Sequence, residues 1–234
     1  KIAGDFHFAN NQLRLAGMPA LAQVGGHLVF TESTMQSRDL VADVFGGTVK
    51  IGITSDEGRV RIAANGTSNL ATLHSQYDTP WLARVAGTTE WQATVLTTTT
   101  ATTWTVESNL KGATIDLPAP IGKAAAEIAP IKVERREIAG KAGEDQLVVD
   151  YRNELRVIAH RTLAKDAGSV DRALLLVGPA IARGGAADRP GVWVRGQIAD
   201  LDLDEWLAFY RKETARAPAA PAAGAASALE LNGV

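Results

Sequence analysis

The segment TVKIGITSDEGRVRIAA, residues 48–64, contains the clearest structural signal in the chain. Apolar residues alternate with polar or small ones in two runs, and an acidic, glycine-containing stretch separates the runs. Side chains of a strand point to opposite faces with a period of two, so each run places its apolar members on one face. The segment therefore predicts two antiparallel strands joined by a hairpin, with one apolar face. The apolar members are Val49, Ile51 and Ile53 in the first run and Val60 and Ile62 in the second.

The same alternation recurs along most of the chain, in runs bounded by Gly, Asn or Pro. Leu155 and Val157 continue it in the carboxyl-terminal half. These runs predict a mainly β protein, an antiparallel sheet with one apolar face and a few short helices. The predicted strands comprise residues 2–8, 11–15, 27–31, 34–45, 48–54, 59–64, 91–97, 102–110, 112–117, 131–137, 146–150, 153–160, 173–177 and 191–198.

Two short helices are predicted where acidic or hydroxyl residues precede the tripeptide Trp-Leu-Ala. The first covers residues 79–85, since a proline near its start suits the first turn of a helix. The second follows Asp202, which caps it, and Glu205 three residues later completes a capping box. In this interpretation Leu201 and Leu203 face the core.

The two predicted helices close two similar blocks, residues 1–86 and residues 87–215. The repeated tripeptide leaves open whether the blocks are a structural repeat. Residues 216–228 are rich in Ala and Pro and poor in large apolar side chains, which predicts a linker. Residues 229–234 resemble the start of a following strand, so we expect the chain to be an excerpt of a longer protein.

Composition excludes several classes of partner and chemistry. The 234 residues carry a formal net charge of -2 with both signs interspersed, and 6% are aromatic, so no nucleic-acid partner is expected. The absence of Cys excludes disulfides and thiolate chemistry but leaves the compartment open. No stretch approaches the roughly 20 consecutive apolar residues that span a bilayer, so membranes are expected to be contacted only through regions outside this chain.

Patterns for catalysis and metal binding are missing from the sequence. The four His residues lie far apart, and none belongs to a zinc-binding pattern. Asp200, Asp202 and Asp204 alternate as in a calcium loop, but Glu205 stands where an EF-hand needs Gly, and Arg211 where it needs Glu. We therefore predict no catalytic residues, no metal and no cofactor. A carbohydrate-active enzyme that uses Asp and Glu pairs stays an alternative, although no constellation of carboxylates points to it.

Four segments resemble a known protein family. Residues 108–123, SNLKGATIDLPAPIGK, are similar to the Leu-Lys-Gly and Leu-Pro-Ala-Pro-Leu-Gly-Lys segment of the large AsmA-like envelope proteins in the YhdP branch. The segments GHLVFTE (residues 26–32), VFGGTV (44–49) and VWVRG (192–196), the last leading into LDLDEWL (201–207), agree with the same family and follow its order. The resemblance covers nearly the whole chain.

The resemblance implies a fold and a task. Proteins of this family are anchored in the inner membrane of Gram-negative bacteria and cross the periplasm as a twisted β-sheet curved into an open, taco-like groove. They are thought to let phospholipids pass to the outer membrane. The chain would be an interior periplasmic segment of such a conduit, with phospholipid acyl chains and other segments of the same long protein as its partners. The family offers no catalytic residues to transfer.

Candidate groove-lining residues come from the family motifs and from the alternating runs. A purely structural or protein-interaction module of the envelope, with its apolar faces packed as a closed sandwich, is the alternative, and it predicts no continuous groove. The candidates are Leu28, Phe30, Val49, Ile51, Ile53, Val60, Ile62, Ile115, Leu117, Leu155, Val157, Val192 and Val194.

Overall fold

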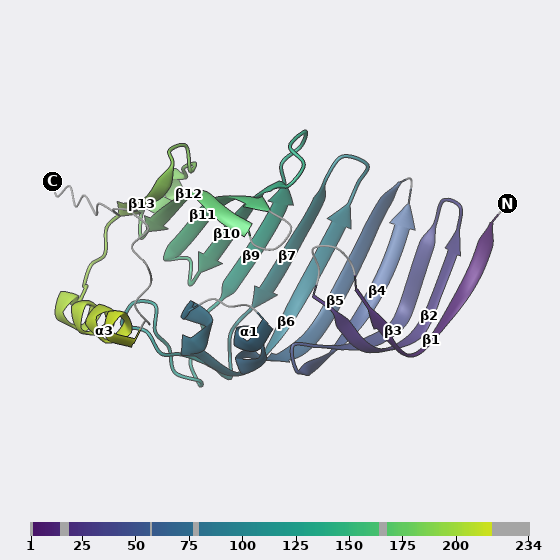
Figure 1. Cartoon of the computed structure of the whole chain (residues 1–234), viewed down its shortest axis with the longest axis horizontal. Coiled ribbons are helices and arrows are strands. Elements are labelled where there is room, and N and C mark those ends of the chain that lie inside the picture. Colours follow the sequence, from purple (N-terminus) through teal and green to yellow (C-terminus); the bar gives the residue numbers. More distant parts are fainter. Residues whose placement is uncertain (1, 15–18, 57, 77–79, 164–167, 217–234) are drawn as a thin grey trace.

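The computed structural model describes residues 2–14, 19–56, 58–76, 80–163 and 168–216. Thirteen strands form one sheet, in which neighbours along the chain are mostly neighbours in space (Figure 1). The order is β1-β2-β3-β4-β5-β6-β7-β9-β10-β11-β12-β13, and β8 pairs with β6 off this path. Because β1 and β13 stand at opposite ends of this order, the sheet is open. The prediction of a mainly β protein is confirmed.

Long strands alternate with short turns, and helices are few. The helical elements are α1 (Leu70–Gln76), the 3-10 helix η1 (Pro80–Arg84), α2 (Ala180–Arg183) and α3 (Leu203–Arg216). The strands are β1 (Ala3–Leu13), β2 (Leu21–Thr31), β3 (Met35–Val44), β4 (Gly47–Asp56), β5 (Arg59–Asn69), β6 (Val85–Thr97), β7 (Thr102–Ser108), β8 (Ala113–Ile115), β9 (Ile131–Glu137), β10 (Glu144–Tyr151), β11 (Leu155–Leu163), β12 (Gly168–Val177) and β13 (Gly191–Gly196).

One strand pair departs from the predicted antiparallel arrangement. β12 and β13 are parallel, with Ala173 opposite Val192 and Leu175 opposite Val194. For β13 to run parallel to β12, the chain must cross back from the end of β12 to the level of its start, which takes a crossover of about a dozen residues. Residues 178–190, which include α2, provide that crossover.

The predicted strands at the amino terminus were too short. Residues 2–8 and 11–15 were predicted as two strands, but residues 3–13 form one strand, β1, with register shifts after Phe8. The predicted strand 27–31 stops short of Gly26. In the structure β2 begins at Leu21, and Gly26 lies within the strand, opposite Phe8. Its φ of 114° belongs to the region that favours glycine, and an added Cβ would lie 2.5 Å from the Asp39 carbonyl oxygen.

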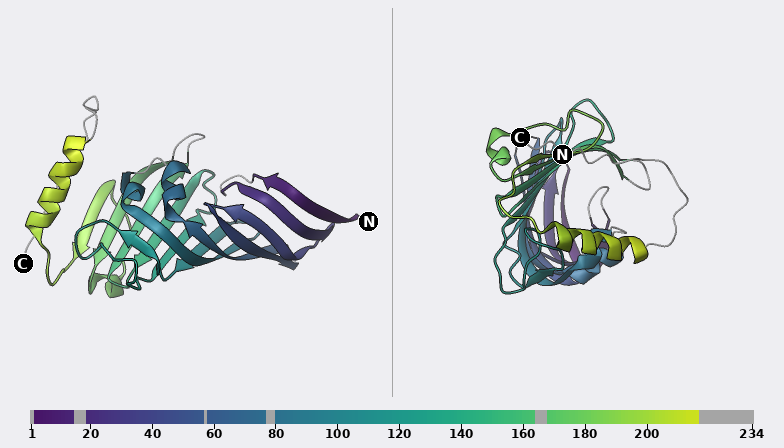
Figure 2. Two further views of the ribbon diagram at one scale, coloured as in Figure 1. Left: turned by 90° about the horizontal axis from the view of Figure 1, so that it is seen from below. Right: turned by 90° about the vertical axis from the view of Figure 1, so that its left-hand side faces the viewer.

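The predicted helices are present in modified form. Within residues 79–85 the structure describes a 3-10 helix, η1, and the sequence patterns predict neither α1 nor α2. Asp202 caps α3 as predicted, because its Oδ1 accepts a hydrogen bond from the Glu205 N–H at 2.9 Å. The prediction that Leu201 and Leu203 face the core is wrong: Leu203 is 59% exposed. α3 lies beyond the end of the sheet (Figure 2), and its contact with the rest of the chain includes a hydrogen bond from Trp206 Nε1 to the Ala119 carbonyl oxygen at 2.8 Å.

Two predictions concern regions that the structure leaves untested. The linker (216–228) and the strand start (229–234) fall almost wholly outside the described residues. The division into blocks at residues 86 and 87 stays a prediction, and that point lies inside β6. None of the described helices is long and apolar enough to cross a membrane.

The sheet is bent about its long axis (Figure 2). We call the face that carries Ile51 and its cross-strand partners the apolar face, and the face that carries Lys50 the outer face. α1 lies on the apolar face, since Leu70 and Leu73 pack with Tyr151 and Leu155. α2 lies on the outer face, where Ala180 joins a buried cluster with residues of β11 and β12.

Candidate functional site

A continuous row of apolar side chains crosses nine neighbouring strands of the apolar face. Residues directly opposite one another on paired strands have their side chains on the same face. With strands about 4.8 Å apart, eight steps between strands give a row about 38 Å long. From β4 to β13 the row consists of Ile51, Ala64, Ala93, Val106, Val133, Val149, Val157, Leu175 and Val194.

The adjacent row on the outer face is polar. One residue along each strand, the side chains point the other way. From β4 to β11 this second row consists of Lys50, Asn65, Gln92, Glu107, Lys132, Asp150 and Arg156. A hollow of about 900 Å³ on this side of the sheet is lined mostly by these polar residues and their neighbours. The two faces therefore have opposite chemical characters over most of the sheet.

Eleven of the thirteen predicted lining residues lie on the apolar face. Those of β4 and β5 are linked through the pairs formed by Ile53 with Ile62 and by Ile51 with Ala64. Phe30 of β2 lies on the same face. Its cross-strand partner Met35 is two residues from Ser37 on β3, and Ser37 lies opposite Ile53. The eleven are Leu28, Phe30, Val49, Ile51, Ile53, Val60, Ile62, Leu155, Val157, Val192 and Val194.

Most of these side chains are only half-buried. Val49 is an exception, because it packs into a cluster with Val24, Leu40 and Ala42. Val192, on β13 beside the last residue of the row, is 71% exposed. Within the described residues no second sheet packs on the apolar face. The face is thus an apolar surface that this part of the chain leaves open.

Ile115 and Leu117 lie elsewhere. Ile115 is in β8 and pairs with Val85 at the start of β6, and it packs against the cluster that contains Leu70, Ala113 and Tyr151. Leu117 follows β8 and is half-buried. Both belong to residues 109–130, which we call the covering segment because it packs over one end of the apolar face beside α1. The structure does not bring these two residues into the long row.

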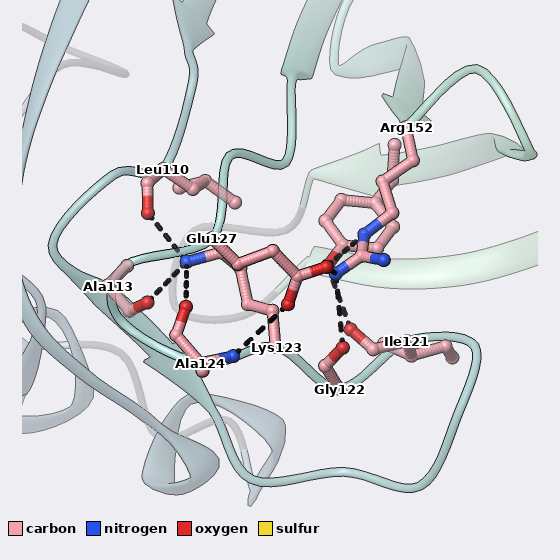
Figure 3. Close-up of polar contacts among 9 residues, drawn as sticks. Leu110, Ala113, Ile121, Gly122, Lys123, Ala124, Glu127 and Arg152 are labelled. Carbon is pink, nitrogen blue, oxygen red and sulfur yellow. Dashed lines mark hydrogen bonds and ion pairs between the residues drawn. The ribbon is translucent and has the colours of Figure 1, made fainter.

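The covering segment is held by a buried lysine (Figure 3). Lys123 Nζ donates hydrogen bonds to the carbonyl oxygens of Leu110, Ala113 and Ala124. Its side chain is buried, and burial lowers the pKa of the ammonium group below its ordinary value. Glu127, on the same segment, forms an ion pair with Arg152 at 2.7 Å. Within the Leu-Pro-Ala-Pro-Ile-Gly-Lys motif, Lys123 thus fastens the segment to itself, and the carbonyl oxygens of Ile121 and Gly122 accept hydrogen bonds from Tyr151 Oη and Arg152 Nη2, which tie the segment to the end of β10 and the turn after it.

A hollow of about 680 Å³ lies between the covering segment and the ends of the carboxyl-terminal strands. Ile121, Tyr151, Leu155 and Val177 contribute apolar surface to it. Leu155 and Val177 are cross-strand partners next to the long row. The hollow therefore continues the apolar face at this end.

Sequence reasoning missed a charged cluster on the apolar face. Asp145 is fully buried and accepts hydrogen bonds from Arg161 Nε at 2.8 Å, from Arg161 Nη2 at 2.7 Å and from Arg135 Nε. Burial raises the pKa of the Asp145 carboxyl, but hydrogen bonds and charges from the two arginines outweigh it and hold that pKa below its ordinary value. The guanidinium of Arg135 also lies 5.1 Å from the ring centre of Trp104.

The histidines of the amino-terminal strands form an exposed pair on the outer face. His27 Nδ1 lies 2.8 Å from Asp39 Oδ2, and His27 Nε2 lies 2.8 Å from His7 Nδ1. The hydrogen bond to Asp39 is the main reason why the pKa of His27 is raised above its ordinary value of 6.5. Over the described ranges, no group of three His, Cys, Asp or Glu side chains is arranged to hold a metal ion.

Comparison with known proteins gives one family. Residues 1–233 match the sequence model of the family described as YhdP protein. No curated protein and no solved structure matches the chain. The match confirms the resemblance found in the four motifs and extends it over the sheet described above.

Proposed function

The chain belongs to the YhdP family, and from that premise we propose that it is a segment of a lipid-transfer conduit whose apolar face shields phospholipid acyl chains. The family consists of envelope proteins related to lipid transport, and it is not an enzyme family. The proposal assigns this chain to the periplasm, as part of an inner-membrane-anchored protein. Its membrane contacts would lie in other regions of that protein.

The row of apolar side chains across nine strands carries the proposal. Exposing a sixteen-carbon acyl chain to water costs about 12 kcal/mol, at about 0.8 kcal/mol per methylene. An apolar surface that runs from strand to strand removes much of this cost at every position along the path. Ala, Val, Leu and Ile side chains offer no fixed polar contact that would hold a chain in one place. Such a lining suits movement along the row better than tight binding at one point.

The exposure of the row supports a conduit over a closed structural module. In a closed sandwich, the apolar faces of two sheets cover each other and their side chains become fully buried. Val133, Val149 and Val157 of the row are half-buried instead. Their partial exposure leaves room for apolar atoms from another molecule.

Site-specific photo-crosslinking in living cells tests this proposal. A photoreactive amino acid replaces Ile51 or Val133 in the full-length protein, and matched variants carry it at Lys50 or Lys132, the preceding residues on the outer face. We expect phospholipid adducts at the first two positions and only background at the second two, as measured by mass spectrometry of the purified protein. Equal lipid labelling on both faces contradicts an oriented lipid path. Protein adducts without lipid at Ile51 and Val133 support the interaction module.

A further inference from the structure

The charged cluster on the apolar face holds two arginines on one aspartate. Two guanidinium groups, those of Arg135 and Arg161, share the single carboxylate of Asp145. Glu137 lies opposite Asp145 on β9, but its carboxylate accepts a hydrogen bond from the Thr102 N–H and makes no ion pair with either arginine. Both arginines thus pair with Asp145 alone, and the negative charge of Glu137 on the same face is in an ion pair with neither of them.

The two arginines keep donors that can reach another molecule. Asp145 engages Nε of Arg135 and Nε and Nη2 of Arg161. Both Nη groups of Arg135 and Nη1 of Arg161 have no partner in the described part of the chain, and they are not among its buried unpaired atoms. The side chains are 12% and 26% exposed, so these donors are only partly surrounded by water. Charge-assisted hydrogen bonds are stronger in such a partly desolvated place.

The cluster adjoins the apolar row. Arg135 is two residues from Val133 on β9, so the two side chains leave the same face about 7 Å apart. Trp104 and Leu147, the cross-strand partners of Arg135, flank it with apolar surface. A cationic group beside a long apolar row matches a molecule that has an anionic group joined to hydrocarbon chains.

We propose that Arg135 and Arg161 bind the phosphate group of a phospholipid whose acyl chains lie on the neighbouring apolar row. Asp145 positions the arginines: its two oxygens hold both guanidiniums side by side, and the remaining Nη groups bind phosphate oxygens. Planar guanidinium groups suit this task because they donate two parallel hydrogen bonds to phosphate. This inference rests on the proposed function, and it adds a binding site at which anionic lipids are held more tightly than uncharged ones.

Binding of three probes to the full chain tests the inference. The probes are dihexanoylphosphatidylglycerol at monomeric concentration, dihexanoylglycerol, which has the same chains without phosphate, and inorganic phosphate. Isothermal titration calorimetry measures each affinity for the unchanged chain and for Arg135→Gln. We expect the phosphate-bearing lipid to bind about tenfold more tightly than dihexanoylglycerol, and Arg135→Gln to abolish that difference while leaving dihexanoylglycerol unaffected.

Arg136→Gln is the matched control. Arg136 is the next residue of β9, points to the outer face, is exposed and forms an ion pair with Glu134, so its replacement changes the net charge equally without touching the cluster. Arg135→Lys keeps the charge but loses the planar fork, and we expect it to restore only part of the difference. Circular dichroism and a thermal melt of each variant identify any that has lost its fold, and Arg135→Lys then carries the test.

The outcomes separate this inference from the proposed function. Equal affinity for both lipids, unchanged in Arg135→Gln, overturns the phosphate site and leaves the lipid path standing. Inorganic phosphate binding as tightly as the lipid, with no binding of dihexanoylglycerol, assigns the cluster to free phosphate and overturns the lipid assignment. Equal losses in Arg135→Gln and Arg136→Gln attribute the effect to net charge and also overturn the site.

Discussion

The amino-terminal and carboxyl-terminal halves of the sheet share the apolar face but differ on the outer face. Across β4 to β7 the outer face is polar, as in the row that begins with Lys50 and Asn65. On β10 to β12 the outer face carries an apolar patch beside Asp150 and Arg156, and α2 and Ala187 cover this patch. The buried cluster there contains Ile158, Leu174 and Leu176.

This difference shows how one sheet combines stability with an open surface. A sheet with one exposed apolar face buries little area, and hydrophobic stabilisation grows with the area removed from water. The carboxyl-terminal half compensates by burying an apolar patch of its second face under α2. The amino-terminal half has one buried cluster, around Val49, on the same face that stays open elsewhere. We therefore expect stability to be concentrated in the carboxyl-terminal half.

The largest expected effect is the loss of stability in Leu176→Ala. Leu176 is fully buried between the sheet and α2, and its truncation leaves a cavity that costs about 3 kcal/mol in the free energy of unfolding. Ile62→Ala in the amino-terminal half removes a half-buried side chain from the open face and should cost about 1 kcal/mol. Urea unfolding of both variants measures the difference. Equal losses contradict the proposed concentration of stability.

A smaller effect is expected for Lys123→Met, at the junction of the two halves. The covering segment pairs with β6 of the amino-terminal half and packs on Tyr151 and Leu155 of the other half. Removing the ammonium group takes the side-chain donor away from the carbonyl oxygens of Leu110, Ala113 and Ala124, the first two of which belong to buried residues, and this should cost about 2 kcal/mol.

Lys111→Met is the control for this prediction, because Lys111 lies on the same segment and is exposed. Hydrogen exchange should become faster in residues 110–125 of Lys123→Met and stay unchanged in the control. Faster exchange throughout the sheet, with none specific to the segment, contradicts a local role for Lys123.

The sequence predicted the faces of the strands well where alternation was strict. Ile51, Ile53, Val60 and Ile62 are on the expected common face, because a period of two fixes side-chain direction once a segment is extended. Alternation fails where both faces are buried. Residues 173–177, ALLLV, are uniformly apolar, so their pattern does not indicate that α2 covers their outer face.

Long-range pairing explains the features that the sequence could not predict. Arg135 stands at a position of β9 where the alternation calls for an apolar residue, and the sequence shows this departure. Its role depends on Asp145 and Arg161, which lie on two other strands. Only the register of three strands brings these charges together. α1 and α2 have seven and four residues, too few for a helical period to stand out from the neighbouring strands.

The smallest expected effect is a pH dependence confined to the amino-terminal half. His27 contacts Asp39 through Nδ1 and His7 through Nε2, and Asp5 adds a further negative charge nearby. The hydrogen bond to Asp39 raises the pKa of His27, and the same contact lowers the pKa of Asp39 below its ordinary value of 3.8. The stabilising contribution of His27 is complete below pH 6.5 and is lost as the pH rises through its raised value. The contribution of Asp39 is lost as the pH falls through its lowered value, so the pair stabilises the fold only between these limits.

Because both side chains are exposed, the change in stability should be slight, and the titration itself is the better measurement. NMR should give a His27 pKa above 6.5 that Asp39→Asn returns toward 6.5, without altering the unfolding of the carboxyl-terminal half. A His27 pKa of 6.5 in the unchanged chain contradicts the contact with Asp39. A pH dependence of stability that persists in Asp39→Asn belongs to other groups.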